Sequence, residues 1–169
     1  MNSKRATPMP KPAPSDYRIA VAKQARRLDL LSQSRLERSY GIVLGRNSAA
    51  DKSVEGDQAT PLGEFYICAK NPRSRHFLSV CLSYPNAEDA ERGLAAGLIG
   101  ADEHRQILDA LHAGRMPPQY TRLGGEIYIH GRGANDDPQG TRGCIALNNE
   151  DMQDLYDRVS IGTPVRIGE

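Results

Sequence analysis

The sequence has little of three things that often reveal a protein's class: long hydrophobic runs, an excess of one charge, and cysteine. No apolar stretch approaches the roughly 20 residues that cross a bilayer, so no membrane span is expected in this chain. The 22 Lys and Arg residues nearly balance the 21 Asp and Glu residues, which leaves a formal net charge of +1. Nucleic-acid-binding proteins usually show a clear basic excess or stripe, so we expect no nucleic-acid partner.

The N-terminal segment lacks the apolar central region of a signal peptide and carries proline at alternate positions from 8 to 14. Because proline blocks regular pairing, residues 1–16 are expected to form a flexible tail. Residues 17–169 are enough for one domain with a real core. Two origins remain open: a cytosolic protein, or an exported protein whose leader is absent from this chain.

An odd number of cysteines, three, leaves at least one thiol outside any internal pairing. Cys68 and Cys81 lie in apolar, strand-like runs. We favour two buried small hydrophobic side chains over a disulfide, because free cysteine is commonly buried. Cys144 differs, since it lies between Gly143 and a short apolar run in a polar, glycine-bearing stretch.

Hydrophobic patterning predicts a mainly β fold with helical insertions (α+β), in the form of an open sandwich or incomplete barrel. Apolar residues spaced three and four apart predict three helices, the last one opened by an Asn cap with acidic residues in its first turn. These helices are expected over residues 86–99, 101–114 and 148–162. Strands are expected at residues 17–23, 26–32, 38–45, 63–70, 76–84, 125–131, 144–147 and 163–168.

The segment IYIHGRGANDDPQGTRGCIAL, residues 127–147, contains what cysteine catalysis requires: a thiol, a proton acceptor and donors for a developing oxyanion. His130 ends one expected strand and Cys144 begins the next, so the two side chains are expected to face each other. Backbone N–H groups around Arg142, Gly143 and Cys144 are candidates for the oxyanion hole. An ordinary strand-end histidine and a half-buried thiol would account for the same two residues.

The other polar candidates have simpler interpretations. His76, His104 and His112 are expected to be solvated in a loop and on a helix. No CxxC or HxxxH spacing accompanies His130 and Cys144, so no metal site is predicted.

These residues resemble the catalytic region of the L,D-transpeptidase (YkuD) family. That family's pattern is a strand with HG, a loop, S/T-H-G-C, a helix and a G-T-x-V strand, preceded by G-D-x-x-T-P-x-G-x-F/Y. The matching segments, within a resemblance over residues 17–167, are 56–57, 60–65, 130–131, 141–145 and 162–165. The triplet Tyr84-Pro85-Asn86 with Asp89 is closer to the YafK-like branch.

The resemblance implies a β-rich YkuD fold and a cysteine acyl-enzyme. It implies diaminopimelate-containing peptidoglycan stem peptides as donor and amine acceptor, with Cys144 as nucleophile and His130 as base. The oxyanion hole would come from Arg142, Gly143 and Cys144. Substrate contacts would come from Arg142, Thr141, Gly131 and Tyr84, although a tyrosine at the last position is more often packed. No cofactor or metal is implied, and we expect a monomer in the cell envelope or periplasm, with the cytoplasm as the alternative.

Two positions depart from the family pattern. Arg142 stands where the family usually has His, and Ala146 stands where it usually has Arg. We expect Arg142 to take over part of the carboxylate binding, because a guanidinium can bind a carboxylate bidentately. Two alternatives remain: an amidase or L,D-carboxypeptidase that hydrolyses the same class of bond, or a non-catalytic wall-binding module.

Overall fold

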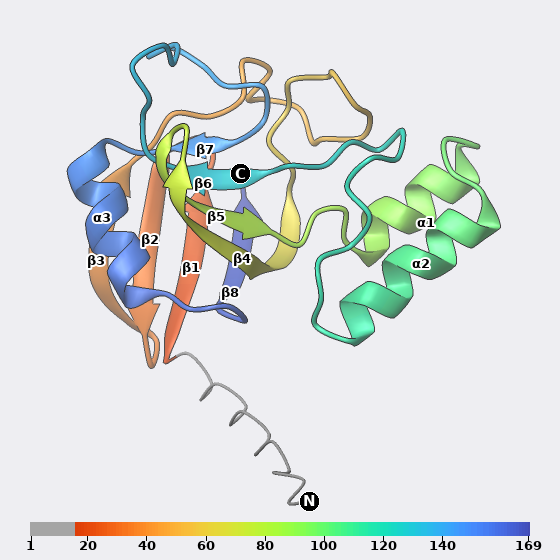
Figure 1. Ribbon diagram of the computed structural model, residues 1–169, viewed down its shortest axis with the longest axis horizontal. Helices are drawn as coiled ribbons and strands as arrows, with labels where there is room; N and C mark the ends of the chain where they lie inside the picture. Colours follow the sequence, from red (N-terminus) through yellow and green to blue (C-terminus); the bar gives the residue numbers. More distant parts are fainter. Residues whose placement is uncertain (1–15) are drawn as a thin grey trace, which may run out of the picture.

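The alternating apolar residues form one eight-stranded sheet, in the order β3-β2-β1-β8-β4-β5-β6-β7 (Figure 1). The computed structural model describes residues 16–169, so the expected tail falls outside the described residues except for Asp16. The strands are β1 Tyr17–Ala22, β2 Arg27–Ser32, β3 Arg35–Gly41, β4 Gly63–Ser74, β5 Phe77–Leu82, β6 Tyr128–His130, β7 Ile145–Ala146 and β8 Pro164–Gly168. The β1–β8 and β6–β7 pairs are parallel, and the other neighbours are antiparallel.

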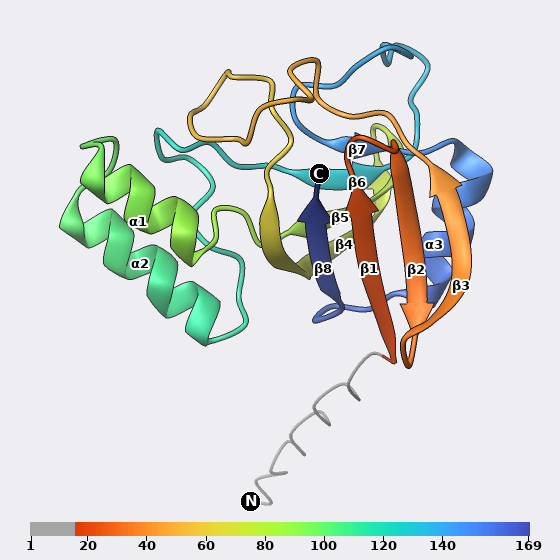
Figure 2. The same cartoon turned by 180° about the vertical axis from the view of Figure 1, so that it is seen from behind.

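The two ends of the sheet meet through two bridges, Val43 with Ala146 and Gly45 with Thr141. Just after β3, the Val43 N–H donates to the Ala146 carbonyl at 2.9 Å, and the Ala146 N–H donates back to the Val43 carbonyl at 2.8 Å. Because β3 and β7 are the first and last strands of the sheet, these bridges curl it into an incomplete barrel, seen from behind in Figure 2. The expected mainly β fold with helical insertions is confirmed.

The core lies on the concave side of this sheet and is covered at one end by α3, Asn149–Arg158. Met152 and Leu155 of α3 are fully buried against the strands. Burial of such a side chain contributes roughly 1.5–3 kcal/mol. The predicted Asn cap is confirmed at Asn148, whose side chain accepts the Asp151 N–H.

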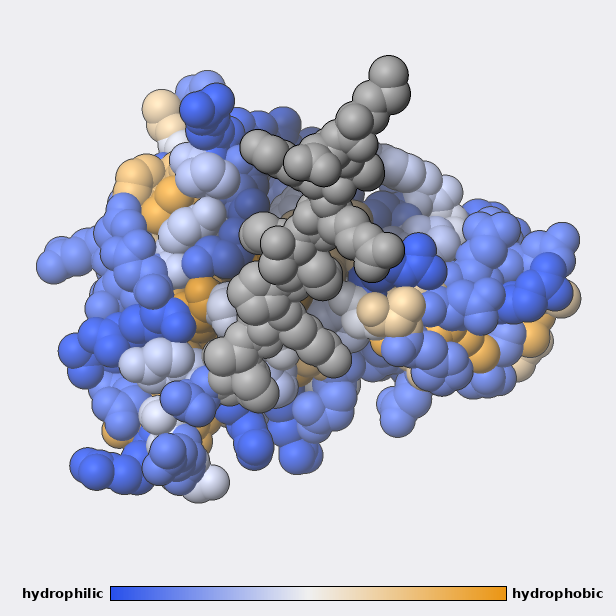
Figure 3. All heavy atoms as spheres, turned by 60° about the horizontal axis from the view of Figure 1, so that its bottom comes forward, coloured by the Kyte–Doolittle hydropathy of each residue, from blue (hydrophilic) through white to orange (hydrophobic). Residues whose placement is uncertain are grey.

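Helices α1, Ala87–Ala95, and α2, Ala101–His112, form a separate pair at the other end of the molecule (Figure 1). Asn86 and Asp89 form a capping box at the start of α1. The pair has a small core of its own, made by Ala90, Ile99, Ile107 and Leu123. Hydrophilic residues dominate the face seen in Figure 3, where hydrophobic residues show only as separate patches. Within residues 16–169, no helix has the length and apolar character that a bilayer crossing requires.

Several strands differ from their expected limits, and the two extended ones, β3 and β4, do so because hydrophobicity does not determine where they begin or end. β3 begins at Arg35, not at residue 38, and is an edge strand on which Leu36 is 60% exposed. β4 continues to Ser74, four residues past its expected end. Its polar extension pairs with β5 and carries the hairpin toward the β6–β7 loop. Strands β6 and β7 are shorter than expected.

Tyr84 belongs to the core and makes no substrate contact in this arrangement, so that expectation is wrong. Its side chain is 0% exposed, and its hydroxyl donates to the Leu123 carbonyl at 2.7 Å. Tyr84→Phe should therefore lower the free energy of unfolding by about 1–3 kcal/mol, because the buried carbonyl loses its donor, while turnover is kept. Denaturant unfolding and activity would be measured on the same sample. Lost turnover at unchanged stability would contradict the assignment.

Candidate active site

The loop that carries Cys144 is fixed by a segment far away in the sequence. The Thr60 hydroxyl donates to the Gly143 carbonyl at 2.8 Å and accepts the Gly45 N–H at 3.0 Å. Gly143 has φ +135°, and a Cβ there would lie 2.8 Å from the Ala59 carbonyl oxygen. Only glycine fits this position, so Cys144 is presented by a tightly held turn.

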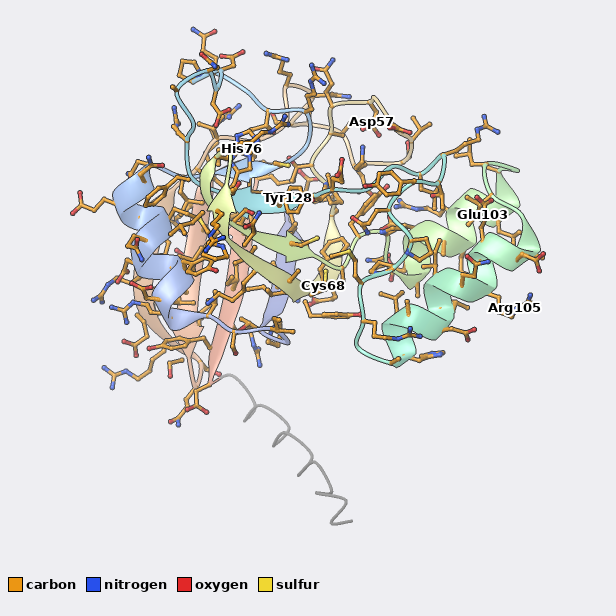
Figure 4. All side chains as sticks on the ribbon, in the orientation of Figure 1. Asp57, Cys68, His76, Glu103, Arg105 and Tyr128 are labelled. Carbon is orange, nitrogen blue, oxygen red and sulfur yellow. The ribbon has the colours of Figure 1, made fainter. Side chains whose placement is uncertain are left out.

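Asp57 belongs to the motif at residues 56–65, and its hydrogen bonds lie within the loop that carries this motif. Its carboxylate accepts the N–H groups of Ser53, Val54 and Ala59 at 2.8–3.1 Å and the Lys52 ammonium at 2.9 Å. These bonds fold the loop that brings Thr60 to the turn of residues 141–144, and Asp57 lies in that loop at the rim of the sheet in Figure 4. The motif is therefore a scaffold for the site.

Thr141 closes the turn internally. Its hydroxyl donates to the Cys144 carbonyl at 2.7 Å and accepts the Gly143 N–H at 3.1 Å. The hydroxyl is thus engaged within the loop, and its expected substrate contact has no free donor in this arrangement. Gly143 likewise has no free amide for an oxyanion. Among the described residues, the N–H groups of Arg142 and Cys144 carry no hydrogen bond, which narrows the predicted oxyanion hole to these two.

The Cys144 thiol lies between two backbone groups of the segment that leads into β6. Its sulfur lies 3.3 Å from the Glu126 carbonyl, to which it donates, and accepts the Tyr128 N–H at 3.4 Å. The register of β6 and β7 pairs Ile129 with Ile145, which places Cys144 level with Tyr128. Burial raises the pKa of Cys144 to about 11, so the thiol is protonated at neutral pH.

His130 lies at the end of β6 with a fixed tautomer. Its Nδ1 lies 2.5 Å from the Gly131 carbonyl, which can only accept, so Nδ1 carries the proton and Nε2 is left as an acceptor. The residue is 5% exposed, and burial lowers the pKa of its ring. In the described chain no hydrogen bond joins His130 to the Cys144 sulfur, yet both residues line one cavity of about 550 Å³.

Gly131 contributes to the position of His130 through its backbone. Besides its carbonyl contact, its N–H donates to the Leu78 carbonyl at 3.0 Å. A Cβ at Gly131 would lie 2.6 Å from Asn149 Oδ1. The residue lines neither of the two cavities that contain Cys144, and its expected substrate contact stays a prediction.

Cys144 lies where two cavities meet, a cleft of about 1030 Å³ and the smaller one that also contains His130. Guanidinium groups dominate the junction. Arg46 is paired with Asp137 at 2.5 Å, whereas Arg75, Arg132 and Arg142 have no carboxylate partner among the described residues. The Arg132 Nε is buried without a hydrogen-bond partner there. The residues common to both cavities are Arg46, Arg75, His76, Arg142 and Cys144.

His76 was expected to be a solvated loop residue, and this expectation is wrong. It lies in the turn between β4 and β5, its side chain is 22% exposed, and its ring stacks on the His130 ring with centroids 4.3 Å apart. The sequence offered one signal, the position of His76 between two strand-like runs. In the structure the second of these strands, β5, pairs with β6 so that Ser79 lies opposite His130. Figure 4 shows His76 at this turn, beside the strand that carries Tyr128.

All three cysteines are free, as favoured from the sequence. Cys81 is buried at the floor of the larger cleft, and the Cys68 thiol donates to its carbonyl at 3.4 Å. Cys68 lies lower on the sheet than Tyr128 in Figure 4, away from the loops around the site. Cys144 is the only one of the three that lines both cavities.

Several solved structures share this fold, among them L,D-transpeptidases and a cell shape determining protein. The helical cell shape determining protein Pgp2 of Campylobacter jejuni is 21% identical, with a TM-score of 0.64 over 92% of this chain and 48% of its own. Bd1075 of Bdellovibrio bacteriovorus is 19% identical, with a TM-score of 0.61 over 94% and 50%. An L,D-transpeptidase from Mycobacterium smegmatis is 15% identical, with a TM-score of 0.53 over 91% and 59%. At these identities the likeness shows the fold.

The family follows from the sequence match. Residues 16–167 match the YkuD L,D-transpeptidase catalytic domain, and the chain belongs to this family. No curated protein sequence matches the chain. The chain spans about half the length of the first two solved relatives. Its assignment to the YafK-like branch stays a prediction.

Proposed function

We propose that this chain is a cysteine-dependent acyltransferase that acts on peptidoglycan stem peptides in the cell envelope. The observation that carries the proposal is the place of Cys144, at the junction of two cavities, beside two unoccupied backbone N–H groups and in the same cavity as His130. Family membership supports the reaction class. The predominance of arginine at the junction supports a substrate that carries carboxylates.

In the first step, the Cys144 sulfur attacks a peptide carbonyl that follows an L-centre and precedes a D-centre. The thiol proton passes to His130 Nε2, and a C–S bond forms. The amide C–N bond then breaks, and the amine leaves with the proton from His130. The N–H groups of Arg142 and Cys144 stabilise the oxyanion.

In the second step, an acceptor amine attacks the thioester, loses its proton through His130, and releases the Cys144 thiol. Water in place of the amine gives hydrolysis. Because the resting thiol is neutral and donates to the Glu126 carbonyl, it must turn toward His130 before it reacts. We therefore expect proton transfer to accompany attack, without a stable thiolate–imidazolium pair at rest.

The test is incubation with purified muropeptides and mass spectrometry of the products. Cross-linked or amine-exchanged peptides would support transfer, and shortened peptides alone would support the peptidase or amidase alternative. A folded protein that binds muropeptides and never forms a Cys144 thioester would favour the wall-binding alternative and refute the proposal.

Arg142 is proposed to bind a substrate carboxylate. It lines both cavities, and its guanidinium makes no hydrogen bond or ion pair within residues 16–169. Arg142→Lys keeps the charge but loses the planar fork, and Arg142→Ala loses both. The alanine variant should lose about tenfold or more in kcat/KM on free-acid stem peptides, because a charge-assisted hydrogen bond contributes roughly 1.5–3 kcal/mol.

The lysine variant should show a smaller loss, and amidated peptides should be affected less than free acids in both variants. Arg105→Ala on α2, which removes an exposed pair with Asp102, is the matched control. Equal selectivity in the wild type and both Arg142 variants would show that the carboxylate is bound elsewhere.

A further inference from the structure

The imidazole ring of His76 stacks on the ring of His130, the proposed base. The rings of His130 and His76 are stacked at an interplanar angle of 25°, and they come from neighbouring elements of the sheet, β6 and the β4–β5 turn. His130 lines the smaller cavity, whereas His76 lines both cavities. The stack therefore fixes the plane of the base at the point where the two cavities join.

His76 is itself oriented from both sides. Its Nδ1 lies 2.7 and 2.8 Å from the two carboxylate oxygens of Asp136, and its Nε2 accepts the Arg75 Nε–H at 3.1 Å. This pattern defines one tautomer, with the proton on Nδ1 directed at the carboxylate. Asp136 in turn accepts the Gly133 N–H at 2.7 Å, which ties it to the loop after β6.

The Asp136 carboxylate is the negative charge that favours protonation of His130. When the base takes the thiol proton, a cation forms in a buried cavity whose other ionic groups are mostly positive. Burial lowers the pKa of His130, and the nearby His76 and Arg132 lower it further, while the Gly131 carbonyl and Asp136 raise it. Burial alone would raise the pKa of Asp136, but the bonds from Gly133 and His76 lower it, so it stays ionised. The titratable and charged groups that line this cavity are Arg46, Arg75, His76, Arg132, Asp136, Asp137, Arg142 and Cys144.

We propose that His76 and Asp136 form a positioning pair for His130. His76 holds the plane of the catalytic ring by stacking, and Asp136, aligned by His76, stabilises the positive charge that His130 acquires during attack. A cation beside an aromatic face is favourable, and more so where water is excluded. In many catalytic triads an acid accepts the Nδ1 proton of the catalytic histidine and so orients its ring. Here the Gly131 carbonyl accepts the Nδ1 proton of His130, and the acid, Asp136, contacts His76 instead.

A metal site is the competing explanation for the same residues. His76, His130 and Asp136 offer ligand atoms that lie within 4.8 Å of one another. However, four arginines line the same cavity, and their positive charge opposes a bound cation. The positioning role therefore fits the surroundings better.

Three variants test the pair: Asp136→Asn, His76→Phe and the double variant. Phenylalanine keeps a ring to stack on His130 but cannot bond Asp136. Each single variant should lower kcat by about ten- to a hundredfold, by analogy with the loss of an outer partner of a metal-ligating histidine. KM should change little. In Asp136→Asn the acidic limb of the kcat/KM profile should move to lower pH, because the base loses a stabilising charge. The double variant should be no worse than either single one, since the two residues act as a unit.

The inference rests on the proposed function, so a second measurement uses no acyl substrate. The rate of Cys144 alkylation by iodoacetamide depends only on the thiol and its base, and its pH dependence should shift in the same variants. His104→Phe is the matched control, because His104 forms a histidine–carboxylate pair with Glu91 at 2.8 Å far from the site, on α2.

Wild-type alkylation and kcat profiles in folded Asp136→Asn would overturn the proposal, as would losses that multiply in the double variant. Inhibition by micromolar Zn²⁺ that disappears in His76→Phe would also overturn it and favour the metal site. If muropeptides are not processed at all but the alkylation profiles shift as expected, the proposed function fails while the pair stands.

Discussion

Cys144→Ala is expected to abolish product formation and leave the fold intact. Cys144 is the only cysteine that lines both cavities. The backbone N–H groups of Arg142 and Cys144 carry no hydrogen bond among the described residues, so they are available to an oxyanion. Removal of a nucleophile in a covalent mechanism leaves only binding and oxyanion stabilisation, so turnover should fall by several orders of magnitude. The measurement is mass spectrometry of muropeptides after prolonged incubation, together with a thermal unfolding curve. Wild-type turnover in this variant would refute the cysteine mechanism.

The other two cysteines are the matched controls for this experiment. Cys81 is buried beneath the larger cleft, and Cys68 is half-buried on β4. Cys81→Ala should cost roughly 1–2 kcal/mol of stability, and Cys68→Ala no more than this, with turnover kept. A folded Cys68→Ala or Cys81→Ala variant without turnover would show that the wrong thiol had been assigned.

His130→Ala is expected to slow acylation by about a hundred- to ten-thousandfold, the usual contribution of a positioned acid–base group. The reason is the neutral resting thiol: with a pKa of about 11, very little thiolate is present at neutral pH without a base. In the wild type, alkylation of Cys144 should rise as His130 loses its proton, below the usual range for histidine because burial lowers its pKa. In the variant only the rise toward pH 11 should remain.

His104→Ala on α2 controls for a general effect of removing an imidazole. An unchanged alkylation profile in His130→Ala would show that the two side chains are not coupled. Since no hydrogen bond joins them within residues 16–169, this experiment tests the proposed turn of the thiol as well as the identity of the base.

The sheet was predictable because its central strands alternate apolar and polar residues, and burial follows that alternation in β1, with Ile19 and Val21 inside. Helix ends were predictable where a cap is written in the sequence, as at Asn148. The edge strand β3 and the outer half of β4 were not, since their pairing is satisfied by backbone bonds among polar residues. Periodicity carries no information about such segments.

The candidate site divides in the same way. His130 and Cys144 could be proposed from the sequence because their neighbours form short motifs. Tyr84 was misassigned because a motif shows which residues recur and not which way a side chain points. The sequence gives no indication of Asp136 against His76, or of Thr60 against Gly143, because these contacts join segments that are far apart along the chain.

The hydrogen bond from the Thr60 hydroxyl to the Gly143 carbonyl joins residues that are 83 positions apart. The turn of residues 141–144 is consequently not a local structure, because the segment after β3 and the loop before β4 both hydrogen-bond to it or to each other around it. Local opening can cost less free energy than global unfolding, and opening of this docking would abolish the proposed activity in a molecule that is otherwise folded. The proposed activity would therefore depend on the docking that joins the two ends of the incomplete barrel, and it could be gained or lost with that docking as one cooperative unit.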